Sequence, residues 1–119
     1  MIGTSATRLT LRTARGQGAQ QNAIDAWARG LPVGNVRAAV IAEGAFFELA
    51  APPGVPVERL VSGCVCCVGL VPLRVTLTRL LRMQRPTHVL LLIADATHVE
   101  QVRALATDGR LGVTLEMDE

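Results

Sequence analysis

The chain has 119 residues, which is the length of one domain with room for a sizeable core. Half of the residues are hydrophobic but only 3% are aromatic, so the core must be aliphatic. All 12 basic residues are arginine, and a net charge of +2 is too small to indicate a nucleic-acid-binding protein.

The apolar segments are too short to cross a bilayer. The N-terminal residues 1–8 contain no apolar stretch behind a basic start, as a signal peptide would require. The longest apolar run covers only residues 89–94. We therefore expect a cytoplasmic protein without membrane association, in which thiols stay reduced.

Strand and helix patterns alternate in the first half of the chain. Residues 8–12 alternate polar and apolar side chains, as a half-buried strand does. A glycine-containing turn over 13–18 precedes a helix predicted over 19–29, which Gly30 ends. The continuous apolar run 37–42 predicts a strand covered on both faces.

The second half continues the alternation and predicts an α/β fold. Adjacent prolines make residues 50–56 a loop. A strand is expected at 57–61, followed by a helix that begins at Pro72 and has an apolar stripe at Leu73, Leu77, Leu80 and Leu81 through Met83. A buried strand at 89–93 comes next, and then a helix that carries Val99, Val102, Ala104 and Leu105 and is closed by Asp108 and Gly109. The last elements are a strand at 111–115 and a frayed tail at 116–119. This order predicts a single domain over residues 1–119, with a mostly parallel sheet flanked by helices.

All three cysteines lie within four residues, in the motif Gly-Cys-Val-Cys-Cys over 63–67. Bridges between such close neighbours are strained, and an odd count leaves one thiol unpaired. Cys64 and Cys67 have the spacing of a metal chelate, and Cys66 adds a third thiolate donor. The alternatives are three buried structural thiols, or a thiol-redox role.

These motifs together resemble the nucleotide-binding domain of the CobW-type (CobW/HypB/UreG-like) metal-handling P-loop GTPases. The resemblance covers roughly residues 8–115 and includes the cysteine motif, the strand leading into Glu43 and Gly44, and the later strand leading into Asp95. It implies a P-loop-NTPase-like three-layer sandwich, with the cysteine motif between the second strand and a following helix.

The sequence departs from that family at the phosphate loop. In register, Ala19 stands where the family has the P-loop lysine, and Gln20 where it has the Mg²⁺-binding hydroxyl. Gly16 and Gly18 remain, either as a degenerate phosphate-binding loop or as a plain strand-to-helix turn. Since no lysine exists to substitute, we expect a degenerate Walker A motif and no GTP hydrolysis. The chain also ends before any guanine-reading segment and before the family's C-terminal domain.

Several single residues are candidates for the site. Glu43 is the expected fourth metal ligand, because the resemblance brings the end of its strand near the cysteines; the alternative is a solvated loop glutamate. His88 and His98 are either ligands or surface or capping histidines. Asp95 is either a site carboxylate or a helix cap. Arg59 and Arg74 either lower the pKa values of the thiols or are surface charges.

The predicted function is transition-metal binding, with zinc as the expected ion, through Cys64, Cys66, Cys67 and Glu43, in metal trafficking or sensing. Expected partners are the ion itself and a metal-requiring client, a full-length relative or a second copy of the chain. One alternative is an inactive GTPase-like homologue that acts as a dimerisation or interaction module. The other is a residual GTP-binding protein.

Overall fold

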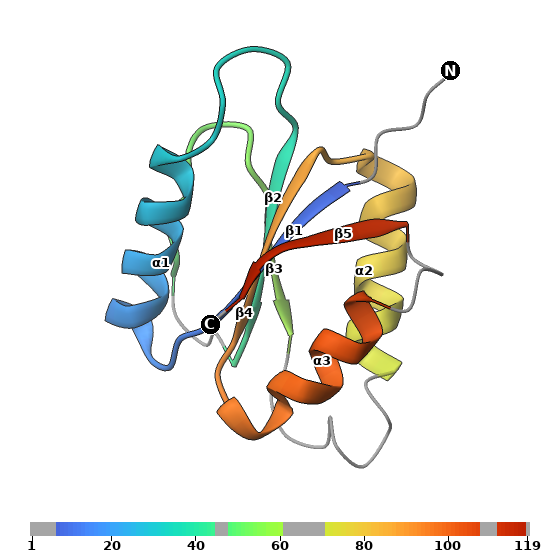
Figure 1. Cartoon of the computed structure of the whole chain (residues 1–119). Helices are drawn as coiled ribbons and strands as arrows, with labels where there is room; N and C mark the ends of the chain where they lie inside the picture. Colours follow the sequence, from blue (N-terminus) through green and yellow to red (C-terminus); the bar gives the residue numbers. More distant parts are fainter. Residues whose placement is uncertain (1–6, 45–47, 61–70, 108–111, 119) are drawn as a thin grey trace.

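The protein is an α/β domain built on one five-stranded sheet (Figure 1). The structure, a computed structural model, describes residues 7–44, 48–60, 71–107 and 112–118. The strands are β1 (Thr7–Thr13), β2 (Ala38–Glu43), β3 (Val57–Leu60), β4 (His88–Ile93) and β5 (Val113–Asp118), and the helices are α1 (Gln17–Arg29), α2 (Val71–Gln84), the 3₁₀ turn η1 (Ala96–His98) and α3 (Val99–Ala106).

All the strand pairs are parallel, in the order β3-β2-β4-β1-β5. Helix α1 covers one face of the sheet, and α2 and α3 cover the other (Figure 1). This three-layer arrangement confirms the predicted fold class. It follows from the sequence because parallel strands need crossover connections, and a helix that buries one apolar stripe is the usual crossover.

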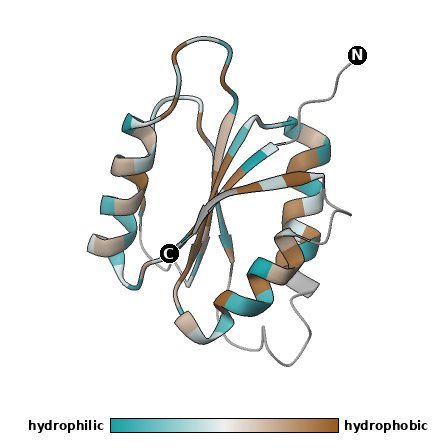
Figure 2. Cartoon of the chain, in the orientation of Figure 1, coloured by the Kyte–Doolittle hydropathy of each residue, from teal (hydrophilic) through white to brown (hydrophobic). Residues whose placement is uncertain are grey.

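The two central strands are buried on both faces. Every residue of β2 is buried, and in β4 only the first residue, His88, is more than slightly exposed. Helices on both faces exclude water from these strands, which is why their sequences are runs of aliphatic residues without alternation. Figure 2 shows the same pattern, with hydrophobic residues along the strands and polar residues on the outward sides of the helices.

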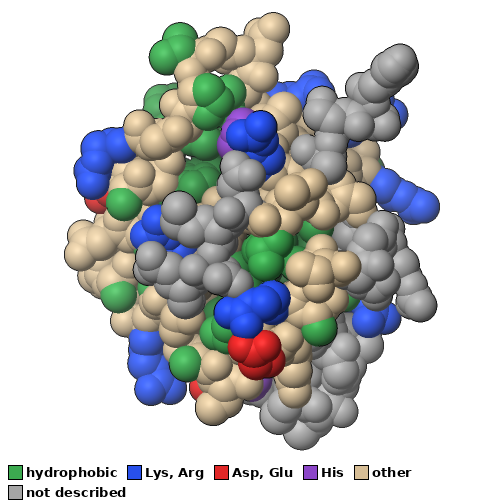
Figure 3. All heavy atoms as spheres, viewed as in Figure 1, with side chains coloured by type: hydrophobic (Ala, Val, Ile, Leu, Met, Phe, Trp, Pro, Cys, Tyr) green, Lys and Arg blue, Asp and Glu red, His purple; other side chains and the backbone are tan. Residues whose placement is uncertain are grey.

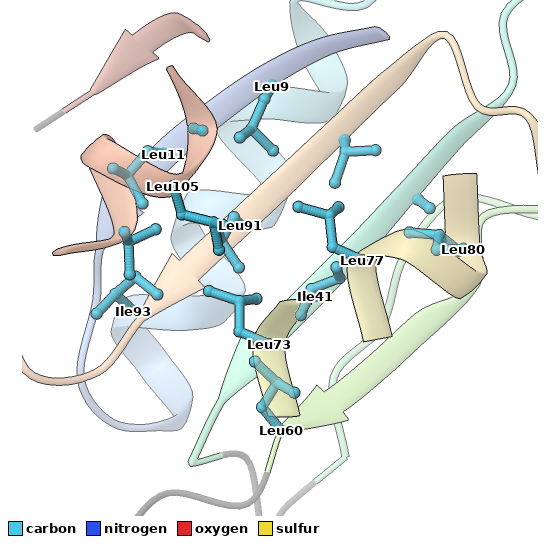
Figure 4. Packing of buried hydrophobic residues seen from close by; sticks show 14 residues of the cluster. Leu9, Leu11, Ile41, Leu60, Leu73, Leu77, Leu80, Leu91, Ile93 and Leu105 are labelled. Carbon is cyan, nitrogen blue, oxygen red and sulfur yellow. The ribbon is translucent and has the colours of Figure 1, made fainter. Parts of the chain in front are cut away.

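The larger core lies between the sheet and the helices α2 and α3. Leucine and isoleucine side chains from the strands point toward those of the two helices (Figure 4). Its fully or nearly fully buried members include Leu9, Leu11, Ile41, Leu73, Leu77, Leu80, Leu91 and Ile93. The smaller core, on the α1 face, is centred on Ile24 and Trp27. The stripe predicted for α2 is confirmed at Leu73, Leu77 and Leu80.

Three predicted boundaries or positions are wrong. Helix α1 begins at Gln17, two residues earlier than predicted, because Gly16 rather than Gly18 ends the turn. Residues 116–118 extend β5 instead of forming a frayed tail, because the backbone of β5 pairs with β1 up to Asp118. Met83 is 78% exposed, since the buried stripe of α2 turns away from it.

The strand order creates a switch point at the carboxyl edge of the sheet. Strands β1 and β4 are neighbours, but α1 leaves β1 toward one face while α3 follows β4 on the other. In α/β proteins, ligands bind outside the carboxyl ends of strands whose connections diverge in this way. The candidate site therefore consists of the residues that follow β1 and β4, together with the end of β2.

Candidate functional site at the carboxyl edge of the sheet

Glu43 is a buried carboxylate at the last position of β2. It is 3% exposed, so it is not the solvated loop glutamate that the sequence left open. Its Oε1 atom accepts a hydrogen bond from the backbone N–H of Ala94 at 2.8 Å, just beyond the end of β4. The bond fixes the carboxylate at the carboxyl edge of the sheet, and the role of Glu43 as a ligand stays a prediction.

Gln20 ties the ends of two strands together from the first turn of α1. Its Nε2 donates to the carbonyl oxygens of Ala14 and Glu43, at 3.1 and 3.0 Å. The side chain is only 1% exposed, and among the described residues its Oε1 has no hydrogen-bond partner. Gln20 is thus a buried structural amide at the start of α1.

We expect Gln20→Leu to lower the free energy of unfolding by roughly 2 kcal/mol or more, because two buried carbonyl oxygens lose their donor. Urea denaturation followed by circular dichroism measures the change. Gln17→Leu is the matched control, since Gln17 is exposed and its amide donates to the carbonyl of Glu48 at the surface. Equal losses in the two variants would contradict a buried bridging role for Gln20.

His98 lies beside Glu43, although 55 positions separate them in the chain. The Nδ1 atom of His98 is 3.4 Å from Oε2 of Glu43, and the two side chains are 11% and 4% exposed. The expectation of a surface or capping histidine is therefore wrong, and no side-chain hydrogen bond caps α3 at this position. Burial follows from η1, which turns the chain back over the end of the sheet before α3 begins.

Asp95 serves as the cap of η1. Its Oδ1 accepts from the backbone N–H of Thr97 at 3.0 Å and from the hydroxyl of the same residue at 2.8 Å. These two hydrogen bonds, foremost that from the backbone, hold the pKa of the Asp95 carboxyl below its ordinary value, with smaller contributions from the nearby His98 and Arg15. The capping alternative for Asp95 is confirmed, and its exposure leaves it outside the buried pair.

Gly16 and Gly18 have different roles at the start of α1. Gly16 precedes the helix with φ +88° and ψ 162°, a conformation that side chains strongly disfavour. Gly18 lies in the first helical turn, and a methyl group there would meet no atom within 4 Å. The described backbone is that of a strand-to-helix turn, so one glycine is required by conformation and the other is not.

Alanine at these two positions is expected to change stability in opposite directions. Gly16→Ala should lower the free energy of unfolding by about 1–3 kcal/mol through backbone strain. Gly18→Ala should raise it by up to about 1 kcal/mol, because alanine loses less backbone entropy in a helix. Urea denaturation of both variants measures the signs, and a loss of stability in Gly18→Ala would contradict this description of the turn.

The three cysteines lie outside the described residues, so their predicted role stays a prediction. The described chain ends at Leu60 of β3 before them and resumes at Val71 of α2 after them.

The two flanking arginines are surface charges in the described part of the chain: Arg59 is 3.7 Å from a Glu48 oxygen, and Arg74 is exposed on α2. On the face drawn in Figure 3, arginine side chains occur at several separate places.

The described residues bring together Gln20, Glu43 and His98. The sequence indicated Glu43 as the expected ligand and His98 as a ligand or a surface or capping histidine. The helical spacing of Gln20 with Ile24 and Trp27 could have indicated that Gln20 is buried, because all three lie on the buried side of α1. His88, at the other end of β4, lies next to Thr87, with its Nδ1 2.9 Å from the threonine hydroxyl. No group of three or more histidine, cysteine, aspartate or glutamate side chains that could hold a metal is found among the described residues.

A hollow of about 360 Å³ lies between the second half of α1 and residues 50–52, and none of the predicted site residues line it. Within the described ranges, every helix is too short or too polar to span a bilayer. Comparison of the chain with known protein families, with curated proteins and with solved structures finds no match.

Proposed function

We propose that this protein binds a transition-metal ion, with zinc as the expected ion, through Cys64, Cys66 and Cys67, and that it serves in metal trafficking or sensing without GTP hydrolysis. The chemistry rests on three thiols within four residues of a chain that has no other cysteine. The observation that carries the proposal is the location of the strand that leads into the motif. Strand β3 ends beside the buried carboxylate of Glu43.

The end of β3 is joined directly to the end of β2. Leu60 pairs with Glu43 in the parallel register, and the backbone N–H of Gly44 donates to the carbonyl of Leu60 at 2.8 Å. Cys64 follows Leu60 by four residues, so the covalent chain alone keeps it within about 14 Å of that carboxyl edge. At that same edge lies the Glu43 carboxylate, with one oxygen fixed by Ala94 and the other 3.4 Å from His98, and in this proposal the thiols reach it.

Three thiolates and one oxygen or nitrogen donor match the tetrahedral preference of zinc. A site with three cysteines and one exchangeable position suits transfer of the ion better than permanent storage. Ala19 and Gln20 occupy the positions of the phosphate-loop lysine and hydroxyl, so nucleotide hydrolysis is not part of the proposal. Control of metal release then belongs to a partner protein, to pH or to thiol oxidation, in a reducing, cytoplasmic setting.

Titration of the reduced protein with Co²⁺ tests the proposal. Thiolate ligands give an intense charge-transfer absorption in the near ultraviolet, and tetrahedral Co²⁺ gives visible bands. We expect both to saturate at one ion per chain and to disappear when Zn²⁺ is added. The absence of the charge-transfer absorption in fully reduced protein would refute metal binding through the cysteines.

A further inference from the structure

The contact between Glu43 and His98 does not have the form of a hydrogen bond. Oε2 of Glu43 and Nδ1 of His98 are 3.4 Å apart, and Nδ1 has no hydrogen-bond partner among the described residues. A buried polar nitrogen without a partner costs stability, and native proteins rarely leave one in this state. The pair therefore calls for an explanation beyond packing.

The spacing of the two atoms fits a shared metal ion. Zinc binds imidazole nitrogen and carboxylate oxygen at roughly 2.0–2.2 Å in a tetrahedral arrangement, so two adjacent ligand atoms lie about 3.3–3.5 Å apart. The observed separation of 3.4 Å falls within this range. The two donor types also belong to the set that zinc accepts in proteins.

We propose that Oε2 of Glu43 and Nδ1 of His98 are adjacent ligands of one transition-metal ion at the carboxyl edge of the sheet. The inference rests on the proposed function for the remaining ligands of that ion. Since a tetrahedral site holds four ligands, Glu43 and His98 leave two positions for thiolates, so the inference revises the three-thiolate set to two thiolates bound at a time. It assigns a ligand role to His98, for which the sequence offered no spacing to any other donor.

The surroundings of Glu43 hold the carboxylate ready for a cation. The Ala94 N–H fixes Oε1 at 2.8 Å, and Gln20 fixes the main-chain carbonyl of Glu43 at 3.0 Å. Such supporting hydrogen bonds orient metal ligands, and the loss of one typically costs about 10–100-fold in metal affinity. Within the described residues, the only cationic group in ion-pair distance of Glu43 is His98, which is charged only when protonated. A bound ion would neutralise this buried carboxylate without that proton.

The experiment uses the two histidines of the chain, one of which is an internal control. His88→Asn leaves His98 as the only histidine, so its ring nitrogens can be followed by ¹⁵N NMR without ambiguity. On addition of one equivalent of Zn²⁺, we expect the Nδ1 signal of His98 to move to the range of a metal-bound nitrogen. An Nδ1 signal that stays where it is would overturn the inference and leave a simple carboxylate–imidazole contact.

Affinity measurements with a chelator competitor give the second readout. Both His98→Asn and Glu43→Gln should weaken Zn²⁺ binding by about 100-fold, and His88→Asn should leave it unchanged, since loss of even a supporting group costs 10–100-fold. Unchanged affinity in folded His98→Asn protein would also overturn the inference.

The failure of this inference differs from the failure of the proposed function. Thiolate-to-Co²⁺ absorption with an unmoved His98 signal supports the cysteines and overturns the role of His98. A moved His98 signal without thiolate absorption supports the Glu43–His98 pair and refutes the cysteine site. No Zn²⁺ binding by either readout refutes both.

Discussion

Replacing Cys64, Cys66 and Cys67 together by serine is expected to weaken Zn²⁺ binding by at least about a thousandfold. Thiolates supply most of the affinity of such sites, where binding free energies reach about 10–16 kcal/mol, and a serine hydroxyl is not deprotonated at neutral pH. Competition with a chromophoric chelator measures the loss. The expected result leaves only weak binding, of the kind that a carboxylate and an imidazole can provide.

A serine substitution within the same segment provides the control for this variant. Val65→Ser changes the residue between the first two cysteines without removing a thiol, and it should bind Zn²⁺ within a few-fold of the wild-type protein. Both variants should keep the far-ultraviolet circular dichroism of the reduced protein. Equal affinity in the triple serine variant and in Val65→Ser would show that the cysteines are not ligands.

Leu91→Ala is expected to be the most destabilising single substitution proposed for this chain, with a loss of about 3–5 kcal/mol. Leu91 is 1% exposed at the centre of β4 and lies among the labelled side chains of Figure 4. Truncation removes buried surface and leaves a cavity between two layers that are held by the strands and by α2, so the site cannot collapse fully. Urea denaturation measures the change in the free energy of unfolding.

Met83→Ala is the matched control on the neighbouring helix. Its side chain is 78% exposed, so its truncation should change the free energy of unfolding by no more than about 0.5 kcal/mol. A loss below about 1 kcal/mol in Leu91→Ala, or a larger loss in Met83→Ala, would contradict the described orientation of the core between the sheet and α2.

The sequence predicted the fold because local patterns and burial agree along most of the chain. The aliphatic runs that form β2 and β4 contain too few polar residues for an exposed strand. Helix α2, which lies between them in the chain, has an apolar stripe at helical spacing. Hydrophobic periodicity did not predict the end of β5, because backbone pairing determines where that strand ends. Residues 116–118 are polar or charged in the main, yet their backbone continues the ladder with β1, which no hydrophobic period reveals.

The candidate site was predictable only where its residues are close in sequence. Glu43 follows directly from an apolar run, so its place at the end of a strand could be predicted. His98 could not be placed beside it, because the contact depends on β2 and β4 being neighbours and on η1 folding over the sheet edge. The burial of Gln20 depends on α1 starting two residues earlier than predicted, which brings its amide over the ends of β1 and β2.

The resemblance to the CobW-type GTPases stays a prediction. The parallel three-layer architecture is consistent with it, but many α/β proteins share that architecture, and a fold does not determine a function. The chain combines a cysteine motif that follows β3 in the sequence with a buried carboxylate and an imidazole at the carboxyl edge of the sheet. Metal binding is therefore the property on which the account depends.

The metal content of the purified, reduced protein tests that property most directly. Elemental analysis of protein isolated without a metal-affinity step or chelator should give about one transition-metal ion per chain, with zinc as the expected ion, and the triple serine variant prepared in parallel should contain almost none. A wild-type protein with no transition metal, and with no uptake of Zn²⁺ or Co²⁺ on addition, would contradict the account.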